Sequence, residues 1–261
     1  MFRERERITD PRHNLIFGVP FSANSFGEIL SYMDRYICEK KTGYHISVIN
    51  LESTSYGERM RSHLEYIKDS VYSCCDSVSI VIISRLLKRP ISRLYGPDLM
   101  LKCSEYGVER KWRHFFLGGE EGVPELISKR LSEKFPGLII AGTYSPPFRP
   151  LSEAEDEALT QQINASEPDI IWVGLGVPKQ EIWIANHKNK INAPWFIGVG
   201  AAFNFHAGIT KRAPLFVRQV GLEWLYRLMR EPRRLIWRNI RTYLFLFRMF
   251  FRRLQKGKWL P

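Results

Sequence analysis

Short apolar runs that alternate with helix-like segments restrict the fold of this 261-residue chain more than any other feature. Five such runs predict strands, at 45–50, 112–117, 138–143, 169–175 and 195–199. Helices are predicted at 24–40, 55–70, 121–134, 152–166 (opened by Ser152) and 179–190. Residues 78–87 fit either a strand or a helix. The alternation predicts an α/β protein with a parallel sheet, and Ile170-Ile-Trp-Val173 fits a strand buried on both faces.

The predicted sheet also indicates where function should lie. Such sheets bind ligands beyond the carboxyl ends of their strands, so the loops after residues 50, 117, 143, 175 and 200 are the candidates. After about residue 212 the pattern changes to helices alone. We therefore predict a core of residues 1–211 and a C-terminal appendage of residues 212–261.

Charge is concentrated in that appendage. Of a formal net charge of +12, the segment 230–261 carries +9, from ten Lys or Arg residues and one acid, Glu231. The rest of the chain is nearly neutral, which is unlike a uniformly basic nucleic-acid-binding protein. The uneven distribution indicates an anionic partner for the appendage.

The segment 235–254 mixes aromatic and aliphatic residues with Arg every few positions. Its longest unbroken apolar run, Tyr243 to Phe247, is far too short to span a bilayer, which takes about 20 residues. A basic helix with a Trp, Phe and Leu face suits a membrane interface, where anionic headgroups attract arginine. The alternative is a terminal helix packed on the core.

The four cysteines have no spacing typical of zinc ligands and fit reduced thiols in a cytoplasmic compartment. The charged segment Met1 to Arg12 lacks the apolar stretch of a secretory signal.

Three places combine residues suited to chemistry. Gly174-Leu-Gly-Val-Pro-Lys-Gln-Glu181 joins a strand to a helix, and its backbone N–H groups can face an anion; a plain tight turn is equally consistent. Gly198 to Gly208 holds His206, which among phenylalanines is more often packed than catalytic. Asp76 follows an apolar stretch, and an acid at the end of a buried strand can act as a general base.

Several strings resemble the WecG/TagA/CpsF family of bacterial glycosyltransferases. They are Gly221-Leu-Glu-Trp-Leu-Tyr-Arg-Leu228, Glu231-Pro-Arg-Arg234, Gly174 to Glu181, Gly198-Val-Gly-Ala-Ala-Phe203 and Arg212-Ala-Pro214. The resemblance implies a Rossmann-like α/β fold of the GT-E type, with an appendage that docks on the inner face of the bacterial cell membrane. It implies inverting transfer, without a metal or other cofactor, of a sugar of the N-acetylmannosamine type. The donor would be a UDP-sugar and the acceptor a sugar on undecaprenyl diphosphate.

The resemblance also implies site residues. Asn50 fits a family Asn, Asp76 lies 26 residues later at the position of the family's Asp, and Arg93 opens Arg93-Leu-Tyr-Gly-Pro-Asp98. Val48 stands where the family usually has Thr, Ser77 where it has Gly, and Asn204 where it has Asp. These departures bear on the donor sugar more than on the reaction.

We expect Asp76 to act as the base. Gly174, Gly176 and Lys179 are expected near the UDP diphosphate, and Asn50, Gln180 and Arg93 at the substrates. Cations against the leaving diphosphate are expected from Arg227, Arg234 and Arg238. Three alternatives remain open: a degenerate family member, a nicotinamide-dependent oxidoreductase and a non-enzymatic basic membrane adaptor. The oxidoreductase would require a three-glycine fingerprint, which is absent. A homo-oligomer is also left open.

Overall fold

The computed structural model describes most of the core and parts of the appendage. The described residues are 13–16, 18–211, 213, 214, 216, 217, 223–230, 232, 233, 236, 237, 240, 242, 244, 245, 247 and 248.

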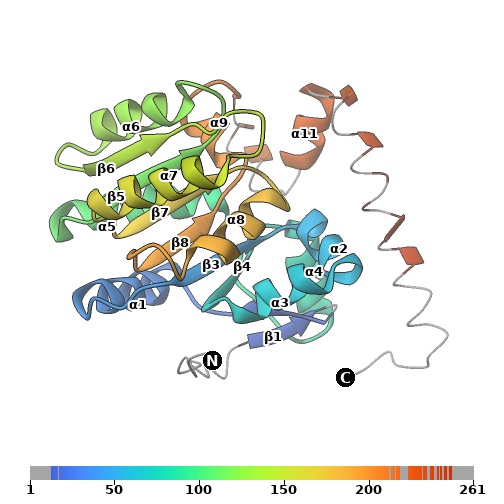
Figure 1. Ribbon diagram of the computed structural model, residues 1–261. Helices are drawn as coiled ribbons and strands as arrows, with labels where there is room; N and C mark the ends of the chain where they lie inside the picture. Colours follow the sequence, from blue (N-terminus) through green and yellow to red (C-terminus); the bar gives the residue numbers. More distant parts are fainter. Residues whose placement is uncertain are drawn as a thin grey trace.

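A six-stranded sheet forms the centre of the molecule (Figure 1), and all of its strand pairs are parallel. The order across the sheet is β4-β3-β8-β7-β5-β6. The strands are β3 (Tyr44–Ile49), β4 (Tyr72–Cys75), β5 (Arg113–Gly118), β6 (Ile139–Tyr144), β7 (Ile170–Gly174) and β8 (Trp195–Gly198). The predicted parallel α/β sheet is therefore confirmed.

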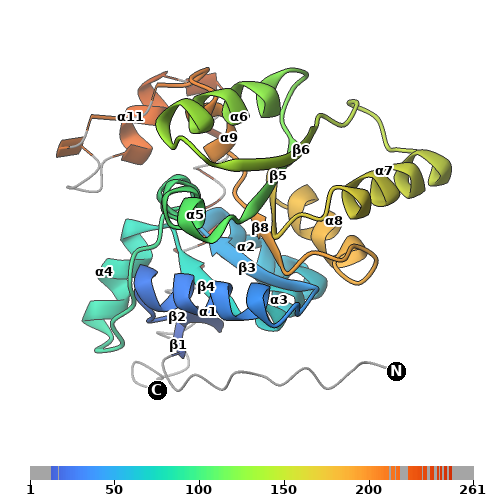
Figure 2. The ribbon, with the colours of Figure 1, turned by 90° about the vertical axis from the view of Figure 1, so that its left-hand side faces the viewer.

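Helices cover both faces of the sheet (Figures 1 and 2). One face packs against α1 (Phe26–Cys38), α5 (Gly96–Arg110), α6 (Val123–Lys134) and α9 (Ala202–His206). The other face packs against α3 (Arg61–Asp69), α4 (Val78–Leu86), α7 (Glu153–Ala165) and α8 (Lys179–His187). Strand β7 shows why two cores form: Ile170 and Trp172 belong to the first, Ile171 and Val173 to the second, and all four are fully buried.

Two serine caps define helix starts. Ser25 and Ser152 each accept a hydrogen bond from the N–H three residues on, and Glu28 and Glu155 bond back to the cap. The predicted helix 55–70 is instead two helices, α2 (Leu51–Arg59) and α3, separated at Met60, whose backbone is extended. Residues 78–87 resolve as helix α4.

Sequence patterns missed several elements, among them β1 (His13–Ile16), β2 (Val19–Ser22), β4 and α5. The antiparallel hairpin of β1 and β2 lies beside β4, where Ser73 N–H donates to Ser22 Oγ at 3.1 Å. Strand β4, Tyr-Ser-Cys-Cys, is short and half polar in sequence although fully buried in the fold. Helix α5 begins with Gly96-Pro97, which reads as a turn.

The strand order creates a switch point between β3 and β8. On one side of this point, β3 is followed along the chain by its outer neighbour β4. On the other side lie β8, β7, β5 and β6. Connections that diverge from adjacent strands leave room beyond their carboxyl ends. This edge is where a ligand is expected.

Helix α11 (Glu223–Arg230) lies in the appendage. Among the described residues, no helix combines the length and the hydrophobicity that crossing a bilayer requires.

His114, on β5, links stability to pH. It is fully buried, and Trp172 Nε1–H donates to its Nδ1 at 3.1 Å. Burial lowers the pKa of His114 from 6.5 to about 3. The unfolded chain therefore binds more protons below pH 6.5, and the contribution of neutral His114 is lost as pH falls from there towards 3.

We predict that His114→Gln, which retains an acceptor, flattens the fall in unfolding free energy between pH 6.5 and pH 4. The slope of unfolding free energy against pH should be smaller in the variant than in wild type, by at most about 1.4 kcal/mol per pH unit. Urea denaturation across that range measures it, and equal slopes in the two proteins would contradict this role of His114.

Candidate active site

Parallel pairing of β3 with β4 brings two predicted residues together. Ile49 and Cys75 are register partners, so Asn50 and Asp76 follow adjacent strand ends. Asp76 N–H donates to the Ile49 carbonyl at 2.9 Å. Asn50 caps α2, its Oδ1 accepting from Ser53 N–H at 2.8 Å. The side-chain NH₂ of Asn50 is thus the part of the amide left to meet a ligand oxygen.

Arg93 lies beside the same strand end. It forms a parallel bridge with Cys75, and Leu94 N–H donates to the Cys75 carbonyl at 2.8 Å. The pKa of the Cys75 thiol is raised to about 12, mainly by burial; the Asp76 charge contributes to the rise, and the hydrogen bond to Ser77 and the Arg93 charge oppose it. Both charged groups are therefore close to one sulfur atom, and the structure brings Asn50, Asp76 and Arg93 to one corner of the sheet.

A carboxylate of the appendage reaches this corner. Glu223, on α11, is 7% exposed, and Tyr95 Oη–H donates to its Oε1 at 3.0 Å. Its Oε2 lies 3.8 Å from the Arg93 guanidinium. No role for Glu223 was predicted from the sequence. The available signal was an acid among the apolar and aromatic residues of Gly221 to Tyr226, because a buried acid requires a partner.

Gly174, the last residue of β7, and Gly176, in the loop that follows, serve different purposes. A Cβ on Gly174 would lie 2.5 Å from the Phe203 ring, so packing alone requires glycine there. Gly176 has φ +76° and open space around its Cα, and its carbonyl accepts from Gln180 N–H at 2.9 Å. Lys179 is exposed at the start of α8. Residues 174–178 are all partly buried, so Lys179 is the exposed residue here, and Gly176 has open space beside its backbone.

Gln180 is buried. It lies on the β8 side of the switch point, whereas Asn50 lies on the β3 side. The Gln180 amide lies against the end of β8: a Cβ on Gly198 would be 2.9 Å from Nε2, and one on Gly200 would be 3.3 Å from Oε1. Gly198 pairs with Ser47 of β3. Gln180 therefore faces the strand edge from the β8 side, while Asn50 reaches it from the β3 side.

Two of the three departures from the family pattern, Val48 and Asn204, lie on β3 and α9. Val48 is partly buried, and a Cβ on Gly96 would contact its Cγ1 at 3.5 Å. Asn204 lies on α9, directly after Phe203.

Two predicted arginines, Arg234 and Arg238, lie outside the described residues, and so does the side chain of Arg227. Within the described part, no group of three or more His, Cys, Asp or Glu side chains could hold a metal ion.

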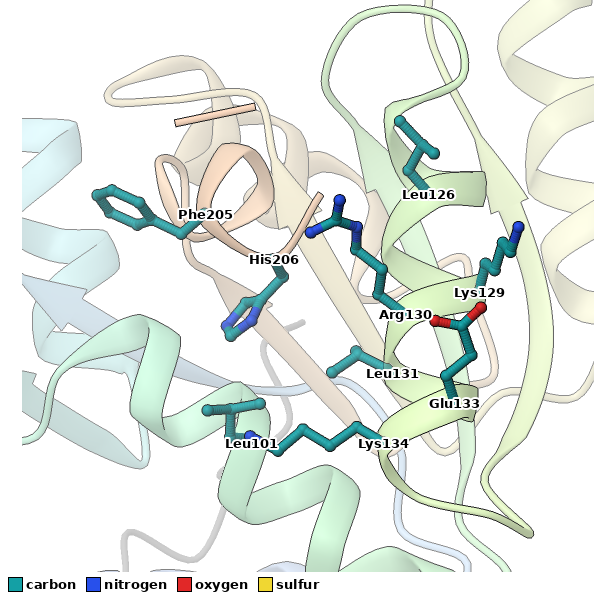
Figure 3. A pocket seen from close by; sticks show the side chains of 9 residues that line it. All are labelled: Leu101, Leu126, Lys129, Arg130, Leu131, Glu133, Lys134, Phe205 and His206. Atoms are coloured by element: carbon teal, nitrogen blue, oxygen red, sulfur yellow. The ribbon is translucent and has the colours of Figure 1, made fainter. Parts of the chain in front are cut away.

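A cavity of about 730 Å³ lies away from this corner, between α5, α6 and α9 (Figure 3). Its lining includes Lys129, Arg130 and Lys134, and none of the predicted site residues. His206 also lines it, with Nε2 bonded to the Pro97 carbonyl at 3.0 Å, which fits a packed histidine.

Comparison with known proteins gives consistent matches. The model of the glycosyl transferase WecG/TagA/CpsF family matches residues 14–258. Proteins from the Staphylococcus aureus strains MW2, NCTC 8325 and COL are each 29% identical over 222 residues, which covers 84% of this chain and 85% of theirs. All three are named N-acetylglucosaminyldiphosphoundecaprenol N-acetyl-beta-D-mannosaminyltransferase.

We predict that Tyr95 and Glu223 are energetically coupled. In a double-mutant cycle with Tyr95→Phe and Glu223→Ala, each of which removes one partner of the hydrogen bond, urea denaturation should give a coupling of roughly 0.5–1.5 kcal/mol, the usual net value of one hydrogen bond. Additive effects would show that α11 is not held to the core by this contact.

Proposed function

The chain belongs to the WecG/TagA/CpsF family of glycosyltransferases, and on this basis we propose that it transfers a sugar from a UDP-sugar to a sugar carried on undecaprenyl diphosphate. The donor sugar is proposed to be of the N-acetylmannosamine type, and the product to serve cell-surface polysaccharide synthesis. The names of the Staphylococcus aureus relatives specify this kind of donor residue and this acceptor. Membership of the family leaves no basis for the oxidoreductase or adaptor alternatives.

The observation that carries the proposal is the meeting of Asn50, Asp76 and Arg93 at adjacent strand ends. A carboxylate beside an amide donor and a guanidinium can accept a proton while the neighbouring groups bind sugar and phosphate oxygens. The three residues come from separate parts of the chain, so their convergence is a property of the fold.

In the proposed mechanism, Asp76 accepts the proton of the acceptor hydroxyl as that oxygen attacks the anomeric carbon from the face opposite the diphosphate. Attack from that face inverts the configuration. Asn50, through its NH₂ group, and Gln180 hold sugar oxygens and hydroxyls. General base catalysis of this kind typically contributes about 10²–10⁴-fold to the rate.

The leaving UDP gains negative charge in the transition state. The turn at Gly176 and the first turn of α8 can direct backbone N–H groups to its diphosphate, with Lys179 alongside. Arg93 adds a cation from the core. Arg227, Arg234 and Arg238 are proposed to add cations from the appendage, which would complete the site when the appendage meets the membrane.

Exposed apolar side chains in the appendage support membrane docking. Phe216, Met229, Trp237 and Phe247 are each between 61% and 70% exposed, in the region that carries most of the net charge. Large apolar groups among cations fit the headgroup boundary of an anionic bilayer.

We predict that Asp76→Asn lowers kcat at least a hundredfold and leaves UDP-sugar affinity within about threefold, because the change removes only the proton acceptor. Radiolabel transfer to a lipid-diphosphate acceptor and calorimetric titration with the UDP-sugar measure the two effects. Near-normal kcat would exclude Asp76 as the base. Asp156→Asn, a carboxylate change on α7, serves as the control.

We predict that Trp237→Ser with Phe247→Ser weakens binding to vesicles of anionic phospholipid at least tenfold, since two aromatic side chains lose their burial in the interface. Phe148→Ser is the matched control, because Phe148 is 96% exposed on the core. Equal losses in the control and the double variant, or no loss in either, would contradict docking through the appendage.

A further inference from the structure

The carboxyl of Glu181 is buried in the first turn of α8, where acids are usually solvated. Glu181 is 6% exposed. Its Oε1 accepts from Gln180 Nε2 at 3.1 Å. Its Oε2 is buried and makes no hydrogen bond to any described residue. The side chain faces a narrow hollow lined by Ser47, Ser53 and Tyr66. Such burial is costly and calls for a reason.

The contact determines which end of the Gln180 amide is available. The nitrogen is engaged by Glu181 and lies over Gly198. The oxygen is turned to Gly200, and this Oε1 is buried without a partner among the described residues. If the amide flipped, its oxygen would meet a carboxylate oxygen, and two acceptors repel. An ionised Glu181 therefore selects one orientation.

We propose that Glu181 is a positioning residue that holds the Gln180 amide so that the site offers a hydrogen-bond acceptor, and that this acceptor selects a substrate sugar with a hydroxyl or amide N–H at the facing position. The inference rests on the proposed function, because it takes the strand edge at Gly200 to be the sugar site. A ligand that lacks the donor would leave the buried Oε1 of Gln180 unpaired. An unpaired buried acceptor discriminates against the wrong ligand more strongly than an apolar pocket does.

Protonation of Glu181 should make the orientation of the Gln180 amide depend on pH. The pKa of Glu181 is raised to about 7, mainly by burial and also by the charge of Glu52 on α2, while hydrogen bonds from its own backbone N–H and from Gln180 partly offset the rise. Tyr66 on α3 also faces the carboxyl, and burial and then the Glu181 charge raise the pKa of Tyr66. His63 on α3 is bonded to Ser53 Oγ at 2.9 Å, and burial lowers its pKa. Once protonated, the Glu181 carboxyl can either accept from the amide NH₂ or donate its O–H to the amide oxygen, so both orientations are satisfied and the selection weakens below about pH 7.

The decisive experiment is a double-mutant cycle on the full chain. Transfer from UDP-N-acetylmannosamine to a lipid-diphosphate N-acetylglucosamine acceptor is measured for Gln180→Ala, Glu181→Gln and the double variant. Each single change should lower kcat/KM by about 10- to 100-fold, and the double variant should be no worse than Gln180→Ala alone, since Glu181 acts only through Gln180. Multiplicative losses, or normal activity of Glu181→Gln, would overturn the proposal.

A matched control separates positioning from loosening of the helix. Asp156 on α7 accepts from His187 Nε2–H, at the other end of α8, at 2.9 Å. Asp156→Asn weakens that anchor without touching Gln180, so kcat/KM should stay within about threefold of wild type. An equal loss in Asp156→Asn and Glu181→Gln would assign the effect to helix loosening and overturn positioning.

A second measurement needs neither substrate nor a folded Glu181 variant. In ¹⁵N-labelled wild type, the side-chain NH₂ signals of Gln180, identified by their loss in Gln180→Ala, should titrate with a midpoint near pH 7. Signals that do not move between pH 5.5 and 8.5 would overturn the coupling. If the wild type transfers none of the tested sugars but the titration is present, then the proposed function fails while the Glu181–Gln180 coupling stands.

Discussion

The pairing of β3 with β4 on one side and with β8 on the other is the constraint on which the site depends. Parallel strands end at the same edge, so their register decides which side chains meet. Ile49 opposite Cys75 places Asn50 next to Asp76, and Ser47 opposite Gly198 brings the Gln180 loop to the same edge. Residues 50, 76 and 180 are distant in sequence, and only this strand order brings them together.

Close packing behind the edge keeps the geometry fixed. A Cβ on Gly118 would lie 2.7 Å from the Gly174 backbone, and one on Gly174 would meet the Phe203 ring, so β5, β7 and α9 approach as closely as glycine allows. Beside this closely packed floor, at the corner of Arg93, Glu223 of the appendage accepts a hydrogen bond from Tyr95 and lies 3.8 Å from the Arg93 guanidinium. The appendage is thus joined to the sheet beside the proposed base, an arrangement suited to coupling membrane contact with catalysis.

Much of the core was predictable because its signals are local. Apolar runs such as Ile170 to Val173 and caps such as Ser152 specify their elements directly. Strand β4 was not predictable, since Ser73 is buried by its contact with Ser22, 51 residues earlier. The same limit applied to the site. Asn50, Asp76 and Arg93 were found through family spacing, whereas Glu223 and Glu181 act through contacts with Tyr95 and Gln180, whose geometry no sequence pattern contains.

The nucleotide is proposed to lie at the edge formed by β3, β7 and β8, and amide hydrogen exchange with and without UDP tests this position most directly. We predict slower exchange in residues 174–182, where the turn and the first residues of α8 would face the diphosphate. We predict no change in residues 126–134 of α6, beside the cavity of about 730 Å³. Protection of α6 with none at 174–182 would place the nucleotide elsewhere and contradict the account.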